Sequence, residues 1–257
     1  MTPQTEVGEV EELEILVLVD NHPGRPGLEP AWGFSALVRA GNLTILFDSG
    51  PDPSVLENNV KALNVDLNEV DFAVLSHEHG DHANGFSYVA EVRKGLTVYV
   101  PGGARRGVVR WLEGLGFKVK EVPGPTKLAP GVLLTGPVRP SFISEQALVV
   151  VVKDMGCAAI VGCSHPGIEH IIPFVYNMTG KRVFLVIGGF HLLGASKDRL
   201  YRIARTLERY GVEYLFPIHC TGEEAERFFA QELKDAYKDG HVGTRIVVRA
   251  GEVEVKG

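Results

Sequence analysis

The chain has 257 residues, 45% of them hydrophobic and 23% charged, which is ordinary for a globular protein, and its formal net charge is −6. The negative charge argues against a basic surface and no run approaches the ~20 apolar residues that span a bilayer, so we expect neither nucleic acid nor a membrane as a partner. Three cysteines that cannot all pair, and an acidic N-terminus without a signal-peptide core, predict a cytoplasmic protein.

Strand-like and helical patterns alternate along the chain without a linker, so we expect a single domain over residues 1–257. Apolar or alternating runs predict strands at 14–19, 36–39, 43–48, 71–75, 97–100, 131–135, 148–153, 158–162, 183–187, 212–218, 245–249 and 252–255. Helical spacing is clearest at 200–210, and a helix is expected after Thr221, which we predict forms a capping box with Glu224. The pattern indicates an α/β fold in four layers, an αββα sandwich with two sheets face to face and helices outside.

The densest group of polar side chains follows the predicted strand at 71–75 and reads His77-Glu78-His79-Gly80-Asp81-His82. Two histidines two residues apart do not share a helix face, so this is a loop site rather than the helical histidine pair of zincin proteases. Imidazole and carboxylate groups at this density predict one or two divalent metal ions. Zinc is favoured over magnesium, manganese and iron.

Three later histidines, His165, His191 and His219, stand in the same setting, directly after an apolar strand and before a predicted helix. Ligand sites of open α/β sheets lie outside the carboxyl ends of strands, so we expect these exits to meet at the metal site. Cys163 and Cys220 flank two of the histidines, and we interpret them as small packed residues rather than nucleophiles.

These segments resemble the metallo-β-lactamase superfamily of metal-dependent hydrolases. Residues 77–82 match its His-x-His-x-Asp-His signature, and Phe47-Asp48-Ser49-Gly50 looks like its strand-end Asp-x-Gly. A closer similarity is to a subfamily like the 7,8-dihydropterin-6-methyl-4-(β-D-ribofuranosyl)aminobenzene-5'-phosphate synthases. It rests on residues 33–35, 144–148, 162–165, 188–192 and 219–222. The resemblance implies an enzyme with the superfamily's αββα fold.

Carried over to this chain, the resemblance implies two sets of metal ligands. His77, His79 and His165 would hold one ion, and Asp81, His82 and His219 would hold the other. The superfamily's bridging aspartate is missing here, since the exit at 188–191 ends in His191. We expect His191 to replace it and to act with Asp81 in catalysis. A neutral imidazole does not bridge two cations as a carboxylate does, so the second ion is expected to bind more weakly than the first.

We expect a small-molecule substrate that carries a phosphate. Helix N-termini suit anions, and two are predicted beside the metal, at Ser164 and Gly167 and at Thr221 and Gly222. The resemblance adds Glu145 and Gln146, as contacts either of the substrate or of the metal ligands. The glycine-rich segment that contains Arg105 and Arg106 is interpreted as a turn, and a phosphate contact by either arginine is the second interpretation.

The sequence leaves the reaction and the oligomeric state open. A bound divalent ion activates water for hydrolysis, whereas a pterin synthase would use it to neutralise a departing pyrophosphate. A redox iron site like that of flavodiiron proteins is a further alternative, with Glu78 as its extra carboxylate ligand. The last alternative is a metal-binding module without catalysis.

Overall fold

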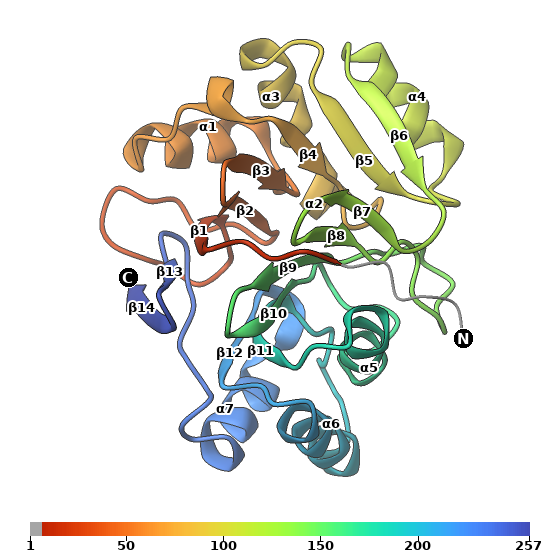
Figure 1. The fold of residues 1–257 in the computed structure, drawn as a ribbon. Coiled ribbons are helices and arrows are strands. Elements are labelled where there is room, and N and C mark those ends of the chain that lie inside the picture. The colour runs from red at the N-terminus through yellow and green to blue at the C-terminus, as the bar shows by residue number, and fades with distance from the viewer. Residues whose placement is uncertain (1–6) are drawn as a thin grey trace, which may run out of the picture.

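The computed structural model describes residues 7–257 as two β-sheets and the helices that cover them (Figure 1). The strands are β1 (Glu12–Val19), β2 (Ser35–Ala40), β3 (Leu43–Phe47), β4 (Phe72–Val74), β5 (Thr97–Pro101), β6 (Lys118–Val122), β7 (Thr126–Ala129), β8 (Val132–Leu134), β9 (Leu148–Val152), β10 (Gly156–Ile160), β11 (Val183–Gly189), β12 (Tyr214–Ile218), β13 (Arg245–Arg249) and β14 (Glu252–Lys256). The helices are α1 (Pro53–Ala62), α2 (Gly80–Ala83), α3 (Phe86–Val92), α4 (Arg106–Gly114), α5 (Ile168–Thr179), α6 (Lys197–Arg209) and α7 (Glu223–Glu232), with short 3₁₀ turns η1 (Leu67–Glu69) and η2 (His219–Thr221).

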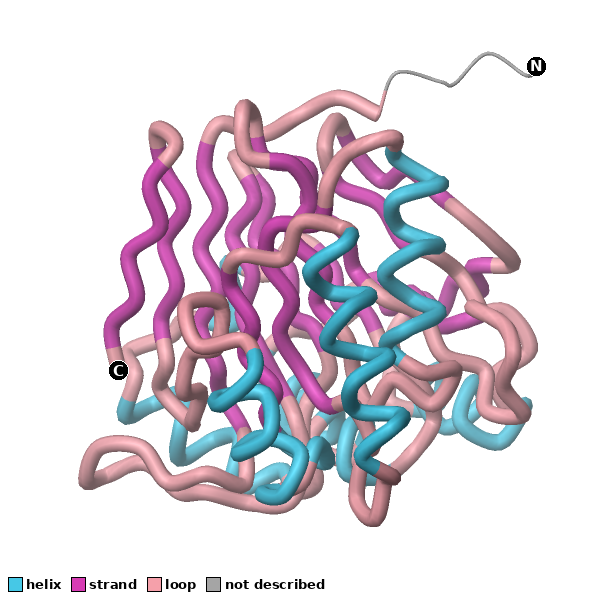
Figure 2. The backbone as a smooth tube through the Cα atoms, turned by 90° about the horizontal axis from the view of Figure 1, so that it is seen from below, coloured by secondary structure: helices cyan, strands magenta, loops and turns pink. Residues whose placement is uncertain are grey.

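The two sheets lie face to face between two helical layers. The larger sheet has the order β14-β13-β1-β2-β3-β4-β5-β6, and the smaller has the order β12-β11-β10-β9-β8-β7. Helices α1, α3 and α4 pack on the outer face of the larger sheet, and α5, α6 and α7 pack on that of the smaller. Seen from below, helices lie in front of the strands and run roughly along them (Figure 2). This architecture confirms the predicted αββα sandwich. Within residues 7–257, no helix has both the length and the apolar character to cross a bilayer.

Strands in the middle of the sandwich are buried on both faces, which explains their unbroken apolar sequences. In β9, Leu148 and Val150 face the other sheet, whereas Val149 and Val151 pack under the helices. All five residues of β9 are buried. A strand with no solvent-facing side has no need of polar residues, and this is why such runs were easy to find in the sequence.

Two strands, β6 and β7, were missed by the sequence analysis, and each is the last strand of its sheet. The sequence of β6 is Lys-Val-Lys-Glu-Val, with both lysines and the glutamate exposed. Charged side chains at a sheet edge discourage pairing with another chain. The polar pattern of β6 therefore follows from its place at the edge, and periodicity alone does not reveal that place.

Parallel pairing places the carboxyl ends of several strands together. Strands β3 to β6 run parallel in the larger sheet, and β10 to β12 run parallel in the smaller one. The loops that leave β4, β10, β11 and β12 carry the histidines singled out in the sequence. Their side chains meet where the two sheets come together, at the position expected for a ligand site of an open sheet.

Candidate metal centre

The backbone of these strand exits is held in an unusual conformation. Ser164, His191 and His219 have φ of 58°, 50° and 55°, and Asp48, directly after β3, has φ of 54°. A positive φ outside glycine is uncommon and costs on the order of 1–3 kcal/mol, so it persists only where the surroundings enforce it. Such residues gather at functional sites, and here they gather at the exits that carry the histidines.

His77, His79 and His165 form the first group, with one ligand atom from each within 4.8 Å of the others. In two of these histidines, His77 and His165, the ring nitrogen Nδ1 makes a hydrogen bond within the protein. His165 Nδ1 donates to Glu145 Oε2 at 2.8 Å. The single hydroxyl proton of Ser76 is donated to Asp48, so His77 Nδ1 donates to Ser76 Oγ at 2.9 Å. These contacts leave both Nε2 atoms free to bind a metal.

The Nε2 atom of His77 is buried and has no hydrogen-bond partner. Burial, followed by the nearby His82, lowers the pKa of His77 well below its ordinary value, so the ring is neutral at pH 7. Leaving a buried nitrogen unpaired costs about 1–3 kcal/mol. A divalent cation would satisfy this lone pair, and the three histidines fit such an ion.

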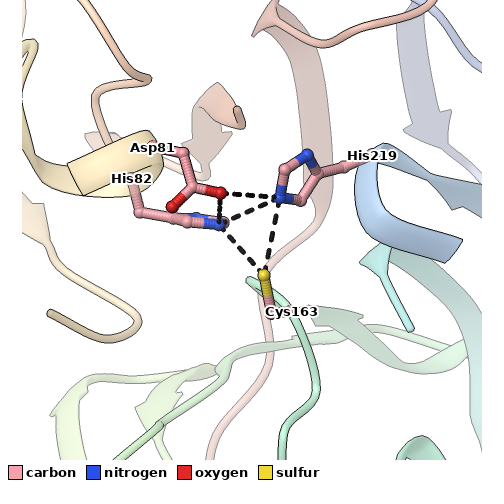
Figure 3. A group of neighbouring side chains, drawn as sticks. All are labelled: Asp81, His82, Cys163 and His219. Atoms are coloured by element: carbon pink, nitrogen blue, oxygen red, sulfur yellow. Dashed lines mark hydrogen bonds and ion pairs between the residues drawn. The ribbon is translucent and has the colours of Figure 1, made fainter. Parts of the chain in front are cut away.

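Asp81, His82, Cys163 and His219 form the second group (Figure 3). His82 Nδ1 donates to Asp48 Oδ2 at 2.7 Å, and His219 Nδ1 lies 3.3 Å from the amide oxygen of Asn21. Both rings therefore turn Nε2 inward, and the two Nε2 atoms are 3.1 Å apart. Two lone pairs at that distance repel unless a proton or a cation lies between them.

Burial, followed by the charge of His219, lowers the pKa of His82 to about 3. His82 is thus neutral at physiological pH, the form in which imidazole binds metal. The carboxylate of Asp81 is one-quarter exposed, with Oδ2 3.5 Å from His82 Nε2 and 3.3 Å from His219 Nε2. The donor set of the second group also fits a divalent ion.

Glu145 holds the loop after β10 in place through hydrogen bonds from the backbone of that loop. It is 1% exposed, and Oε1 accepts the backbone N–H groups of Cys163 and Ser164 at 2.8 and 2.7 Å. Oε2 accepts both the backbone N–H and Nδ1 of His165. Burial opposes its ionisation, but the nearby His77 and the bond from His165 hold the pKa of Glu145 below its ordinary value. This carboxylate thus orients one histidine of the first group and holds the backbone of Cys163, a member of the second.

Asp20 is a further buried carboxylate at the site, and the sequence analysis did not single it out. Its Oδ1 accepts the backbone N–H of His219 at 2.9 Å, and its Oδ2 pairs with His22 Nδ1 at 2.8 Å. His22 Nε2 lies 3.3 Å from Glu226. Asp20 directly follows β1, so the strand-exit argument used for the histidines was the signal that would have found it. The hydrogen bond with Asp20, followed by the one with Glu226, raises the pKa of His22 to about 10.

We expect the ion pairs of His22 to stabilise the fold in a pH-dependent manner. The folded-state pKa of about 10 lies above the ordinary 6.5, so the contribution is complete below pH 6.5 and is lost as the pH rises through about 10. His22 is half-buried, and solvent screening limits the effect to ~1–2 kcal/mol. Urea unfolding of wild type and His22→Gln at pH 6 and above pH 10 measures it. A stability difference that is the same at both pH values contradicts this expectation.

His191 and Glu78 lie near the two groups without joining them. His191 is exposed and falls in a third group with Cys163 and Cys220, while its ring centroid is 4.8 Å from that of His165. It therefore does not stand with Asp81, His82 and His219, where a replacement for the bridging aspartate was expected. Glu78 pairs with Arg105 through a 2.7 Å contact to Nε and accepts the Arg105 backbone N–H.

Four of the side chains predicted to contact substrate are buried and bonded within the protein. Glu145 holds the β10 exit, and Gln146 Nε2 donates to the carbonyl of Leu75. Ser164 Oγ donates to the carbonyl of Gly189, and Thr221 Oγ1 donates to that of Ile218. We infer that these groups position the site rather than reach the substrate.

The predicted capping box at Thr221 is wrong. The N-cap of α7 is Gly222, without a side-chain hydrogen bond, and Thr221 Oγ1 instead accepts the backbone N–H of Phe190. Helices α5 and α7 do begin next to the site, with Gly167 and Gly222 as their N-caps. Their first turns carry Glu169 and Glu223, Glu224 and Glu226, respectively. These carboxylates weaken the attraction of the helix ends for an anion.

Exposed apolar side chains surround the opening of the site. Trp32 is 53% exposed, with its ring centroid 5.2 Å from that of His219. Phe142 is fully exposed and, with Arg139, Pro140, Ser141, Ile143 and His165, lines a cavity of about 620 Å³. No spacing in the sequence marks Trp32 or Phe142, because the exposure of a loop residue is decided by how the loop folds.

Two histidine-rich ligand groups at the carboxyl ends of strands, in a sandwich of two sheets between helices, define a metal-dependent enzyme fold. A sequence-family model described as the metallo-beta-lactamase superfamily matches residues 33–184, and the chain belongs to this superfamily. The matched segment contains all members of the two candidate ligand groups except His219, which lies beyond it.

Named relatives cover almost the whole chain. It is 25% identical to the 7,8-dihydropterin-6-methyl-4-(beta-D-ribofuranosyl)-aminobenzene-5'-phosphate synthase of Methanocaldococcus jannaschii, over 92% of this chain and 97% of the synthase. It is 30% identical to Tm1679, a metal-dependent hydrolase of the β-lactamase superfamily with a known crystal structure. That comparison covers 92% of this chain and 99% of the other, with a TM-score of 0.79. A diphosphatase of the PhnP family shares the fold at 15% identity and a TM-score of 0.62, over 92% and 97% of the two chains.

Proposed function

We propose that the protein is a metal-dependent enzyme that acts on a small phosphorylated substrate carrying a flat ring. The observation that supports this most is the cavity beside His165, where an exposed aromatic ring and an arginine lie next to the first metal group. A heterocycle can stack on Phe142 or Trp32, and Arg139 can pair with a phosphate. In this proposal the phosphate contact moves from the helix N-termini to Arg139 and the bound cation.

The first candidate reaction is that named for the archaeal relative, formation of a dihydropterin–ribofuranosylaminobenzene phosphate. The second candidate is hydrolysis, which the name of the 30% identical structure supports. Both need a cation at the His77, His79 and His165 group, where it would polarise an oxygen of the substrate or leaving group in either reaction and would activate water in hydrolysis.

The protein's own residues would divide the remaining work. Glu145 and Ser76 fix the rings of His165 and His77, so their ligand atoms need no rearrangement. Although burial opposes its ionisation, the contact with His219 keeps the pKa of Asp81 below its ordinary value, so Asp81 is an anion. Its Oδ2 faces His82 and His219, and its other oxygen can orient the attacking group or accept its proton. Contact with Cys220 raises the pKa of His191, which suits His191 to donate a proton to the leaving group.

The other two functional classes have less support. A redox iron site would use Glu78 as a ligand, but this carboxylate is paired with Arg105 instead. A metal-binding module without catalysis would use the three histidines but has no need of the open cavity beside them.

We expect the metal-loaded enzyme to release pyrophosphate from a pterin pyrophosphate only when an aminobenzene riboside phosphate is also present. Turnover of esters or phosphodiesters assayed in parallel would instead support hydrolysis. Trp32→Ala and Phe142→Ala should each raise KM about 5–10-fold with little change in kcat, because stacking contributes ~0.5–1.5 kcal/mol. The control is Tyr201→Ala, an exposed aromatic on α6.

Binding of inorganic phosphate and pyrophosphate by the metal-loaded enzyme tests the phosphate separately. We expect both to compete with substrate. If calorimetry detects neither up to millimolar concentration, the phosphorylated substrate is wrong and a neutral ester or amide replaces it.

A further inference from the structure

Cys163 lies inside the second group of ligands, not beside it (Figure 3). Its Sγ is 3.2 Å from His82 Nε2 and 3.5 Å from His219 Nε2. The two Nε2 atoms are 3.1 Å apart, and Asp81 Oδ2 lies 3.5 Å from the first and 3.3 Å from the second. Sulfur, oxygen and both nitrogens thus surround one point.

These separations match a tetrahedral metal site. Four ligands at the zinc distances of about 2.0–2.3 Å lie ~3.3–3.8 Å from one another at the corners of a tetrahedron. The five separations given above range from 3.1 to 3.5 Å and represent five of the six edges. For the sixth, between Cys163 and Asp81, the ligand atoms lie within 4.8 Å.

The outer contacts of His82 and His219 turn both Nε2 atoms toward the sulfur. Without a metal, the thiol can donate one hydrogen bond, to His82, and His219 must carry a second proton to pair with Asp81, which lies 3.3 Å from its Nε2. One cation satisfies all four atoms.

We propose that Cys163 binds the second metal ion as a thiolate and closes that site with four protein ligands. The thiolate supplies the negative charge that is missing at residues 188–191, where the chain has no bridging aspartate. With Asp81 it neutralises a dication, whereas the first group offers neutral imidazoles only. This reverses the order of affinity expected from the sequence, so the ion at the Cys163 site binds more tightly than the ion held by the three histidines.

The two ions then have different tasks. Metal sites with four protein ligands are typically structural, whereas catalytic sites keep a position open. The ion at Cys163 would stabilise the junction between the two sheets and add positive charge, and the ion held by three histidines would face the cavity. This concerns metal binding, so it does not depend on the identity of the proposed substrate.

Cobalt titration of the apo-protein tests the proposal without any substrate. We expect the first equivalent of Co²⁺ to produce a thiolate-to-cobalt charge-transfer band and the second equivalent to add none. Cys163→Ser should lose the band and bind that equivalent more than about 100-fold more weakly, beyond the 10–100-fold typical of losing an outer partner. Cys157→Ser, a buried cysteine away from the ligands, is the matched control and should retain both.

Cys220→Ser separates this proposal from a cation held by Cys163, His191 and Cys220, and the band should survive it. The proposal is overturned if two ions bind without the band, if the band persists in Cys163→Ser, or if Cys220→Ser alone removes it. Should Cys163→Ser fail to fold, X-ray absorption of the zinc-loaded wild type decides. A sulfur shell near ~2.3 Å, with roughly half a sulfur per zinc, is expected, and a shell of nitrogen and oxygen only refutes it.

Discussion

Replacing both His77 and His79 by alanine is expected to remove one metal ion and abolish turnover. Two of the three ligands of the first group are lost, and His165 alone does not retain the ion. Metal activation contributes several kcal/mol to the transition state, so activity should fall on the order of 10³-fold or more. Elemental analysis should show the content falling from two ions to one, while the cobalt–thiolate band at Cys163 remains.

The structure also predicts how the two single variants differ. His77 is fully buried, so His77→Ala leaves a cavity and costs stability as well as metal. His79 is partly exposed, so His79→Ala should lose the ion with little loss of stability. His170→Ala, an exposed histidine on α5, is the control and should keep full metal content. Full occupancy of both ions in the double variant would show that these histidines are not ligands.

Glu145→Gln is expected to destabilise the apo-protein by ~3–5 kcal/mol. The carboxylate accepts three backbone N–H groups and His165 Nδ1. Glutamine has one acceptor oxygen, and its amide N–H₂ would face some of these donors. The β10 exit would lose its support, and the affinity of the first metal site should fall by about 10–100-fold.

Urea unfolding and metal titration of Glu145→Gln measure both effects, with Glu208→Gln on the exposed face of α6 as a control. The pKa of Glu145 is lowered in the folded state, so its stabilisation is present above pH ~4.5 and is lost as the pH falls through the folded-state value. The difference between wild type and Glu145→Gln should therefore shrink in acid. A difference below about 1 kcal/mol at neutral pH contradicts the role assigned to Glu145.

Much of the fold, and the meeting of the histidines, could be predicted from short stretches of the sequence. Central strands such as β9 and β11 are buried on both faces, so their residues form apolar runs that stand out. The histidines directly follow such runs, and parallel strands end on one side of a sheet, so their meeting was predictable. The αββα sandwich followed from the same alternation of runs and helical faces.

What the sequence alone did not decide depends on contacts between distant residues. Cys163 was interpreted as a packed residue, yet its sulfur lies against His82, 81 positions earlier, and His219, 56 positions later. Glu145 was expected either at the substrate or against a metal ligand, and the fold buries it against His165. Thr221 has the residues of a helix cap, but the N–H of Phe190 from the neighbouring exit uses its hydroxyl instead.

One physical cause separates the features that the sequence determined from those that only the tertiary structure decided. Burial on both faces of a strand and the turn that follows it depend on residues a few positions apart, so the sequence determined the strands and the histidines that leave them. Metal ligation, carboxylate support and the apolar opening depend on which side chains approach within about 4 Å across the two sheets. That proximity exists only after the sheets have packed, so the tertiary structure decided the partners of each ligand and the place of Cys163 among them.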